Sequence, residues 1–234
     1  MIQNELIARS PLRILESSTH GGLGKGNLGV LAARRGVGKT ACLVHIATDQ
    51  LLRGRHVIHV SFAMNTGHIV DWYEDIFREI AVAYGLDQAM AVHDDIVRHR
   101  IIMNFNQQTM RLSQAIGSVR AMIRDGHFAA DCVVVDGYDL TRGGLEELRQ
   151  VRAFAADQGL EIWFSASLGD QEPRYDEAGV PEPLAPLLAE ISVLICLRSE
   201  GKHVRLQLVK DHDQPSAQNP HLELDPKTLL IARV

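Results

Sequence analysis

An α/β fold with a mainly parallel sheet is predicted by three observations on this chain of 234 residues. A short apolar strand over 28–32 leads through a glycine-rich loop into a helix. A second apolar run, over 132–136, has the composition of a central strand that is buried on both faces. Strand-like and helix-like segments alternate along the chain until hairpins close it. We therefore expect a mainly parallel central sheet flanked by helices, with antiparallel hairpins at the C-terminal edge.

Composition describes an ordinary folded protein with an acidic balance. Apolar residues make up 46% and charged residues 23% of the chain, and the net charge is −5. We expect one domain over 21–234, preceded by an N-terminal extension over 1–20. No basic run forms a nucleic-acid tail, and no apolar run is long enough to span a bilayer. Three separated cysteines (Cys42, Cys132 and Cys196) are typical of reduced core residues, which predicts a cytoplasmic protein without membrane contact.

A phosphate-binding loop is predicted between the first strand and a helix over 41–52. Residues 33–40 read Ala-Arg-Arg-Gly-Val-Gly-Lys-Thr, a pattern that opens with Ala or Gly and closes with Gly-Lys-Thr or Gly-Lys-Ser. The two glycines lack a Cβ, so the backbone can wrap a phosphate closely. Lys39 can reach the β- and γ-phosphates, and the Thr40 hydroxyl can bind Mg²⁺. The alternative is a glycine-rich βα turn with a chance Gly-Lys-Thr, and the strand-loop-helix context that the motif requires favours the phosphate-binding loop. The expected nucleotide-binding residues are Ala33, Arg34, Arg35, Gly36, Val37, Gly38, Lys39, Thr40 and Ala41.

The elements around this loop follow from hydrophobic spacing. Pro11 interrupts a short helix over 5–15, and the glycine-rich segment 21–27 leads into the first strand. Residues 56–62 alternate in polarity and predict a strand, whereas 68–84 have the apolar spacing of a helix. The aromatic residues of that helix, Trp72, Tyr73 and Phe77, are predicted to be core residues rather than a base-stacking platform.

Asp136 is the second candidate for Mg²⁺. It ends the apolar run 132–136, at the sheet edge where open α/β sheets bind ligands. Downstream of a phosphate-binding loop, this position predicts a Walker-B carboxylate that holds Mg²⁺ directly or through water. An aspartate that merely begins the Asp-Gly turn is the alternative. The predicted metal ligands are therefore Thr40 and Asp136.

The remaining elements complete the expected sheet and its helices. A short strand is predicted over 100–106, and Thr109 is the predicted cap of a helix that runs to Arg124. A polar, proline-containing loop is expected over 169–186. The other predicted elements are a helix over 145–158, strands over 161–165 and 191–197, a hairpin partner over 203–209, and a closing hairpin over 222–231.

Together these stretches resemble the RecA superfamily, in particular KaiC-like ATPases and the ATPase domain of DnaB-type helicases. The resemblance spans about residues 20–232. It rests on the order and spacing of the glycine-rich lead-in 21–26, the phosphate-binding loop, the strands 59–62, 133–136 and 162–165, the element 209–212, and the hairpin 222–230. It implies a RecA-like P-loop NTPase fold, ATP and Mg²⁺ as ligands, and packing in a ring or filament. It also implies that Lys210 and the residue at His212 act on the neighbouring subunit's nucleotide.

The sequence departs from this family at the positions that cleave ATP. Ala63 stands where the family has the glutamate that activates water, and Met64 follows it. Ala166 stands at the position of a sensor glutamine, and His212 replaces the arginine of a Lys-x-Arg element. Lys39, Asp136 and Lys210 are therefore the remaining catalytic candidates, and Asp139 or Glu74 is a candidate substitute for the missing base.

These departures predict a nucleotide-dependent regulatory or assembly module in which ATP hydrolysis is weak or absent. An arginine that stabilises the transferring phosphoryl group is worth roughly 10³–10⁵ in rate, whereas its loss leaves ground-state binding by the loop in place. The expected partners are nucleotide and either further copies of the chain or another protein.

Two alternative functions remain. The first is an active motor ATPase on single-stranded DNA, which needs basic loops after Asp136, where the sequence offers only Arg142. A small-molecule kinase is the second, and it conflicts with the acidic loop 169–179. Within the phosphate-binding loop itself, Arg34 and Arg35 either contact phosphate or a neighbouring subunit, or are solvated.

Overall fold

The computed structural model describes residues 7–62, 66–83, 89–201, 203–215 and 220–233. One mixed sheet runs through the molecule, with neighbouring strands in the order β10-β9-β7-β6-β1-β5-β4-β2-β3, and β8 pairs with β7. The strands are β1 (Leu28–Ala33), β2 (Val57–Ser61), β3 (Arg100–Asn104), β4 (Cys132–Asp136), β5 (Glu161–Ser167), β6 (Val193–Glu200), β7 (His203–Asp211), β8 (Gln214–Pro215), β9 (Leu222–Leu224) and β10 (Ile231–Arg233).

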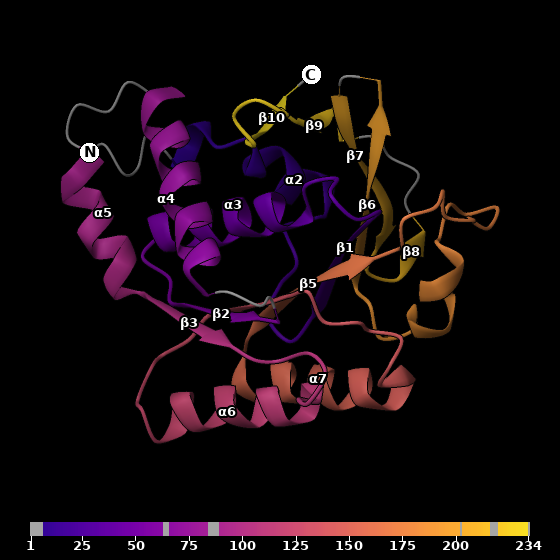
Figure 1. Ribbon diagram of the computed structural model, residues 1–234, viewed down its shortest axis with the longest axis horizontal. Helices are drawn as coiled ribbons and strands as arrows, with labels where there is room; N and C mark the ends of the chain where they lie inside the picture. Colours follow the sequence, from indigo (N-terminus) through magenta and orange to yellow (C-terminus); the bar gives the residue numbers. More distant parts are fainter. Residues whose placement is uncertain (1–6, 63–65, 84–88, 202, 216–219, 234) are drawn as a thin grey trace.

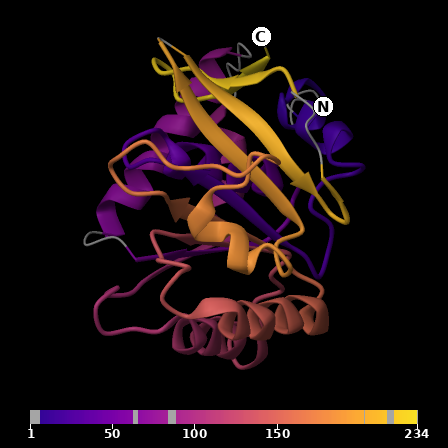
Figure 2. The same cartoon turned by 90° about the vertical axis from the view of Figure 1, so that its right-hand side faces the viewer.

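The sheet is parallel from β6 through β1, β5, β4 and β2 to β3. The C-terminal strands β7, β9 and β10 pair antiparallel at the other edge. Figure 2 shows β6 and β7 as the long ribbon that crosses the molecule. The predicted α/β class, the mainly parallel sheet and the antiparallel C-terminal hairpins are therefore confirmed.

Helices cover both faces of the sheet (Figure 1). The strand β1 is buried along its length because it contributes to both hydrophobic cores: Leu31 packs on the side of α3, and Leu28 and Val30 pack on the opposite side. The helices are α2 (Leu12–Ser18), α3 (Lys39–Leu52), α4 (Thr66–Ala83), α5 (Ala89–Arg98), α6 (Leu112–Arg124), α7 (Gly144–Gln158) and the 3-10 helix η1 (Glu182–Leu187).

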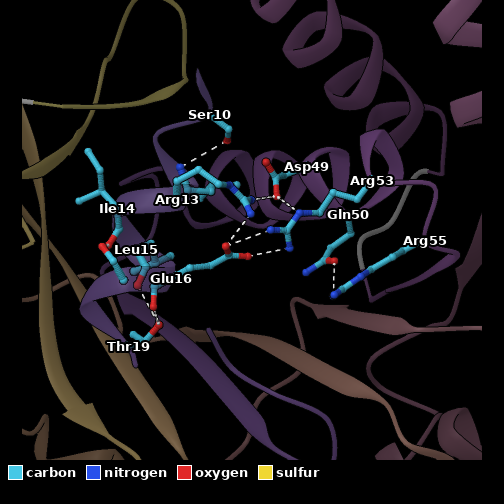
Figure 3. Close-up of polar contacts among 12 residues, drawn as sticks. Ser10, Arg13, Ile14, Leu15, Glu16, Thr19, Asp49, Gln50, Arg53 and Arg55 are labelled. Atoms are coloured by element: carbon cyan, nitrogen blue, oxygen red, sulfur yellow. Dashed lines mark hydrogen bonds and ion pairs between the residues drawn. The ribbon is translucent and has the colours of Figure 1, made fainter. Parts of the chain in front are cut away.

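A network of charged side chains attaches α2 to the C-terminal half of α3 (Figure 3). Arg13 of α2 donates hydrogen bonds to Asp49 of α3 and to Glu16 one turn further along α2. Arg53 also forms an ion pair with Glu16, with 2.7 Å between Arg53 Nη1 and Glu16 Oε1. Leu15 of the same short helix enters the core. The segment predicted as an N-terminal extension thus packs on the helix that follows the phosphate-binding loop.

One predicted helix interruption is confirmed, and one predicted helix cap is wrong. The helical turn over 7–9 ends before Pro11, and Pro11 is the N-cap of α2. Thr109 is not a helix cap, because its N–H bonds to the carbonyl of Asn106 in a turn. The helix α6 starts after Arg111 instead, where the Gln114 side chain accepts the Arg111 N–H at 2.9 Å.

Two further segments carry structure that the sequence analysis did not predict. The helix α5 precedes β3 and was not predicted at all. Within the predicted loop over 169–186, Tyr175 and Pro181 form an isolated bridge and η1 begins at Glu182. This loop is therefore partly ordered by its own contacts.

Candidate functional site

The loop between β1 and α3 has the backbone that its glycines predict. Gly36 has φ of 78° and Gly38 has φ of 110°, values in the left-handed region that favours glycine. Gly38 is the N-cap of α3, so the free amide groups of the first helical turn lie next to the loop. A Cβ on Gly38 would also lie 2.2 Å from Cδ2 of Leu224 in β9. The C-terminal hairpin therefore packs directly against this predicted phosphate-binding loop.

Lys39 lies at the centre of this loop. Its ammonium group donates to the carbonyl oxygens of Ala33 at 3.0 Å and Arg34 at 2.8 Å. Burial lowers the pKa of Lys39, Asp136 opposes this effect, and the nearby Arg35 guanidinium lowers the pKa further. The lysine is thus held among carbonyls of its own loop, at a position where an anion would find a partly desolvated cation.

Asp136 lies within hydrogen-bonding distance of the start of α3. The Thr40 hydroxyl donates to its Oδ2 at 2.8 Å, and the Ser165 hydroxyl of β5 donates to its Oδ1 at 2.6 Å. Ser165 in turn accepts the Gly137 N–H at 2.9 Å. The carboxylate is buried, and its two oxygens are held by side chains from α3 and β5. The structure therefore brings the two predicted metal ligands, Thr40 and Asp136, into contact.

This pair of oxygens fits the requirements of Mg²⁺. Adjacent ligands of an octahedral Mg²⁺ at about 2.0–2.1 Å are separated by about 2.8–3.0 Å. The Thr40 and Asp136 oxygens are 2.8 Å apart. Across the described residues, no group of three or more His, Cys, Asp or Glu side chains could hold a metal. Mg²⁺ commonly keeps several waters and binds few protein oxygens together with phosphate, so a two-oxygen site is sufficient.

The predicted residues line one cleft of about 1180 Å³ at the carboxyl ends of the parallel strands. The loop Arg34–Ala41 forms its floor, and Asp136, Ser165 and Ser167 contribute from the ends of β4 and β5. Ala33, at the end of β1, is buried beneath the loop. Further walls are formed by Phe62, Trp72, Gln107, Gly137, Tyr138, Asp139, Thr141, Gly169, Asp170, Pro183, Ser199, Val204, Leu224, Pro226 and Leu229.

The walls include residues that sequence reasoning did not assign to the site. Val204, Leu224, Pro226 and Leu229 form an apolar side from the C-terminal strands and the turn between β9 and β10. The sequence predicted the elements that carry them, a hairpin partner over 203–209 and a closing hairpin over 222–231, but it did not place either at the cleft. Trp72 is half-buried and lines the cleft, whereas its neighbour Tyr73 and Phe77 are core residues as predicted.

The two candidate substitutes for the base lie in different places. Asp139 lines the cleft, and its Oδ1 accepts the Thr141 hydroxyl at 2.7 Å. Glu74 does not line the cleft and pairs with His93 of α5 at 2.7 Å. Ala63 and Met64, at the expected base position, lie outside the described residues.

Lys210 is remote from the phosphate-binding loop of its own chain. It pairs with Leu194 at the amino end of β6, whereas the loop follows the carboxyl end of β1. Its Nζ donates to the carbonyls of Leu188 at 2.8 Å and Ile191 at 2.6 Å. His212 contacts Asp211 and the Leu23 carbonyl. The structure therefore does not bring Lys210 into the cleft that holds Lys39.

No protein-family model matches the chain, and a search of curated proteins also gives no match. Within the described residues, no helix has the length and apolar character that a membrane span requires.

Proposed function

We propose that this chain is a RecA-like protein that binds ATP with Mg²⁺ and acts as a nucleotide-dependent regulatory or assembly module. The observation that carries the proposal is the convergence of Lys39, Thr40 and Asp136 in one cleft, below glycines with positive φ. Lys39 and the amides of the loop would bind the phosphates. Thr40 and Asp136 would hold Mg²⁺, which supplies charge neutralisation at the phosphates.

The strand order supports a RecA-like arrangement. β5 lies between β1, which carries the loop, and β4, which carries Asp136. This separation by one strand agrees with the fold that the sequence resemblance implies. The apolar side formed by Val204, Leu224 and Leu229 offers a surface for a nucleobase, because ligand pockets combine such walls with a few polar anchors.

We infer that hydrolysis is weak because the residues that position water and the transferring phosphoryl group are replaced. Alanine at position 63 cannot accept a proton, and a histidine at position 212 lacks the bidentate fork of arginine. Ser165 positions Asp136 rather than replacing a base, since its hydroxyl is engaged by the carboxylate.

One observation favours the alternative, an ATPase motor on single-stranded DNA. Asp139 lines the cleft and is the better placed of the two candidate bases. On the other hand, Arg142, the single arginine expected to bind a strand, donates to the Gln107 carbonyl at 2.5 Å. Turnover that depends on Asp139 and is stimulated by single-stranded DNA would favour the motor.

The experiment pairs ATP binding with phosphate release on the same purified sample, with Lys39→Ala as the negative control. Mg²⁺-dependent binding with turnover at least about 10³-fold below that of an enzyme with its arginine in place supports the proposal. Fast turnover that Asp139→Asn abolishes would replace it with the motor. If wild type and Lys39→Ala are equally unable to bind ATP, the proposed function is wrong.

A further inference from the structure

The two arginines of the phosphate-binding loop have carboxylate partners in the loop that follows β5. Arg34 Nη1 lies 3.4 Å from Glu172 Oε2, and Arg35 Nε lies 3.6 Å from Asp170 Oδ1. Arg35 is also close enough to Lys39 to lower the pKa of that lysine. Both arginines therefore lie at the end of the cleft where the phosphates are proposed to bind. Each forms an ion pair with an acidic side chain of a second loop.

The segment 169–177 of the acidic loop 169–179 is anchored at both ends. At its start, the Leu168 N–H bonds to the Ala33 carbonyl at 2.9 Å, and the Arg35 N–H bonds to the Gly169 carbonyl at 3.1 Å. At its far end, the Arg198 guanidinium lies over the Tyr175 ring, 4.2 Å from its centroid. In Figure 2 this orange segment lies beside the β6–β7 ribbon. Only the carboxylates between these anchors depend on Arg34 and Arg35.

These ion pairs are exposed, so they are weak and easily exchanged. Side-chain exposure is 39% for Arg34 and 76% for Glu172, and 79% for Arg35 and 73% for Asp170. Pairs of this kind contribute little in water and are screened by salt. A nucleotide phosphate carries more charge than a carboxylate and accepts the same planar fork of guanidinium donors. Phosphates bound at Lys39 would therefore compete with Asp170 and Glu172.

We propose that Arg34 and Arg35 form a phosphate-sensitive latch that holds the acidic loop over the cleft. The phosphates of the bound nucleotide take over the two guanidinium groups, and the freed carboxylates are repelled by the phosphates. The loop then detaches between its anchors at Gly169 and Tyr175. This inference rests on the proposed nucleotide binding. Release of the acidic loop would change the surface of the protein when nucleotide binds at the same site.

The test is amide hydrogen exchange of residues 169–177 in the full chain, with no ligand, with adenosine, and with ATP and Mg²⁺. ATP is expected to raise exchange in this segment by about two- to fivefold, the scale of one weak exposed pair. Adenosine, which has no phosphate, leaves the segment unchanged. In the double variant Asp170→Asn with Glu172→Gln, the amides of residues 169–177 are expected to exchange without ligand as fast as they do in the wild type with ATP.

The control is Glu177→Gln, which removes one negative charge, where the double variant removes two, from an exposed residue of the same loop that pairs with neither arginine in the described residues. The double variant is expected to bind ATP about two- to tenfold more tightly than this control, because phosphate no longer displaces carboxylates. Equal gains in both variants, or ATP binding that slows or does not change exchange of the segment, would overturn the latch alone. Absence of ATP binding by the wild type would overturn both the latch and the proposed function.

Discussion

At its first turn, α3 presents Lys39 and Thr40 to an open cleft, whereas near its last turn Asp49 is enclosed by Arg13 and Arg53 (Figure 3). Both ends carry buried or half-buried charge. At the C-terminal end the opposite charges come from the chain itself, so the network holds α2 in place. At the N-terminal end, among the residues that the structure describes, the ammonium group of Lys39 has only carbonyls of its own loop as hydrogen-bond partners. The difference separates a structural ion network from a partly buried cation that lines an open cleft.

The largest expected effect is at the structural end. Burial raises the pKa of Asp49, and Arg13 works against that rise. Replacing Arg13 by Met removes the compensating charge and should lower the free energy of unfolding by about 3–4 kcal/mol, because a buried carboxylate is left without its main partner. Urea denaturation measures the change. The control is Arg78→Met, which removes an exposed ion pair on α4. ATP affinity should not change. A loss of ATP affinity with unchanged stability would show that this end of α3 serves binding and not folding.

The middle of α3 provides a pH-dependent test. His45 is buried, its Nδ1 accepts the Ile231 N–H at 3.0 Å, and burial lowers its pKa to about 4. Between pH 6.5 and pH 4 the unfolded chain binds a proton that the folded chain does not, so stability is lost as the pH falls. The wild type should lose about 2–3 kcal/mol relative to His45→Gln over this range. If denaturation curves of both proteins shift in parallel, the histidine is not buried in the neutral form.

At the ligand end, the effect should appear in binding and not in folding. Lys39→Ala removes charge-assisted hydrogen bonds to phosphate and should weaken ATP binding by about 10- to 100-fold. Its free energy of unfolding should stay near the wild-type value, since the lysine bonds only to its own loop. Calorimetric titration measures the affinity, and the exposed Lys25→Ala is the matched control. A large loss of stability in Lys39→Ala would show that this lysine stabilises the fold.

The two glycines of the loop give the smallest effect and the sharpest comparison. Both have positive φ, so alanine is strained at either position. A Cβ at Gly36 meets no atom within 4 Å, whereas a Cβ at Gly38 meets Leu224 at 2.2 Å. Gly38→Ala should therefore destabilise the fold by about 1–2 kcal/mol more than Gly36→Ala does. Equal thermal denaturation of the two variants would show that β9 does not pack on the loop.

The parts of the site that were predicted from sequence are those encoded locally. The spacing of residues 33–40 defines the loop without reference to the rest of the chain, and the run 132–136 predicts a buried strand that ends in Asp136. The contact between Thr40 and Asp136 follows once both elements end at the same sheet edge. Local order of this kind also predicted the main strands and the C-terminal hairpin.

The parts that were missed depend on contacts between distant segments. Leu224 reaches the cleft because β9 pairs with β7 at the sheet edge, which no local spacing encodes. The turn at Asn106 displaced the predicted cap at Thr109, since the same backbone groups can form either structure. Lys210 donates hydrogen bonds to carbonyls of residues 188 and 191. A sequence motif does not encode such tertiary contacts.

We propose that Thr40 and Asp136 hold Mg²⁺ beside nucleotide phosphates bound at Lys39. The most direct test measures ATP affinity in Mg²⁺ and in EDTA, for the wild type, Thr40→Val and the cleft control Thr141→Val. The wild type and the control should bind ATP about tenfold more tightly with Mg²⁺, whereas Thr40→Val should lose most of that gain and keep its affinity in EDTA. Equal wild-type affinity in both buffers, or full Mg²⁺ dependence in Thr40→Val, would contradict the claim.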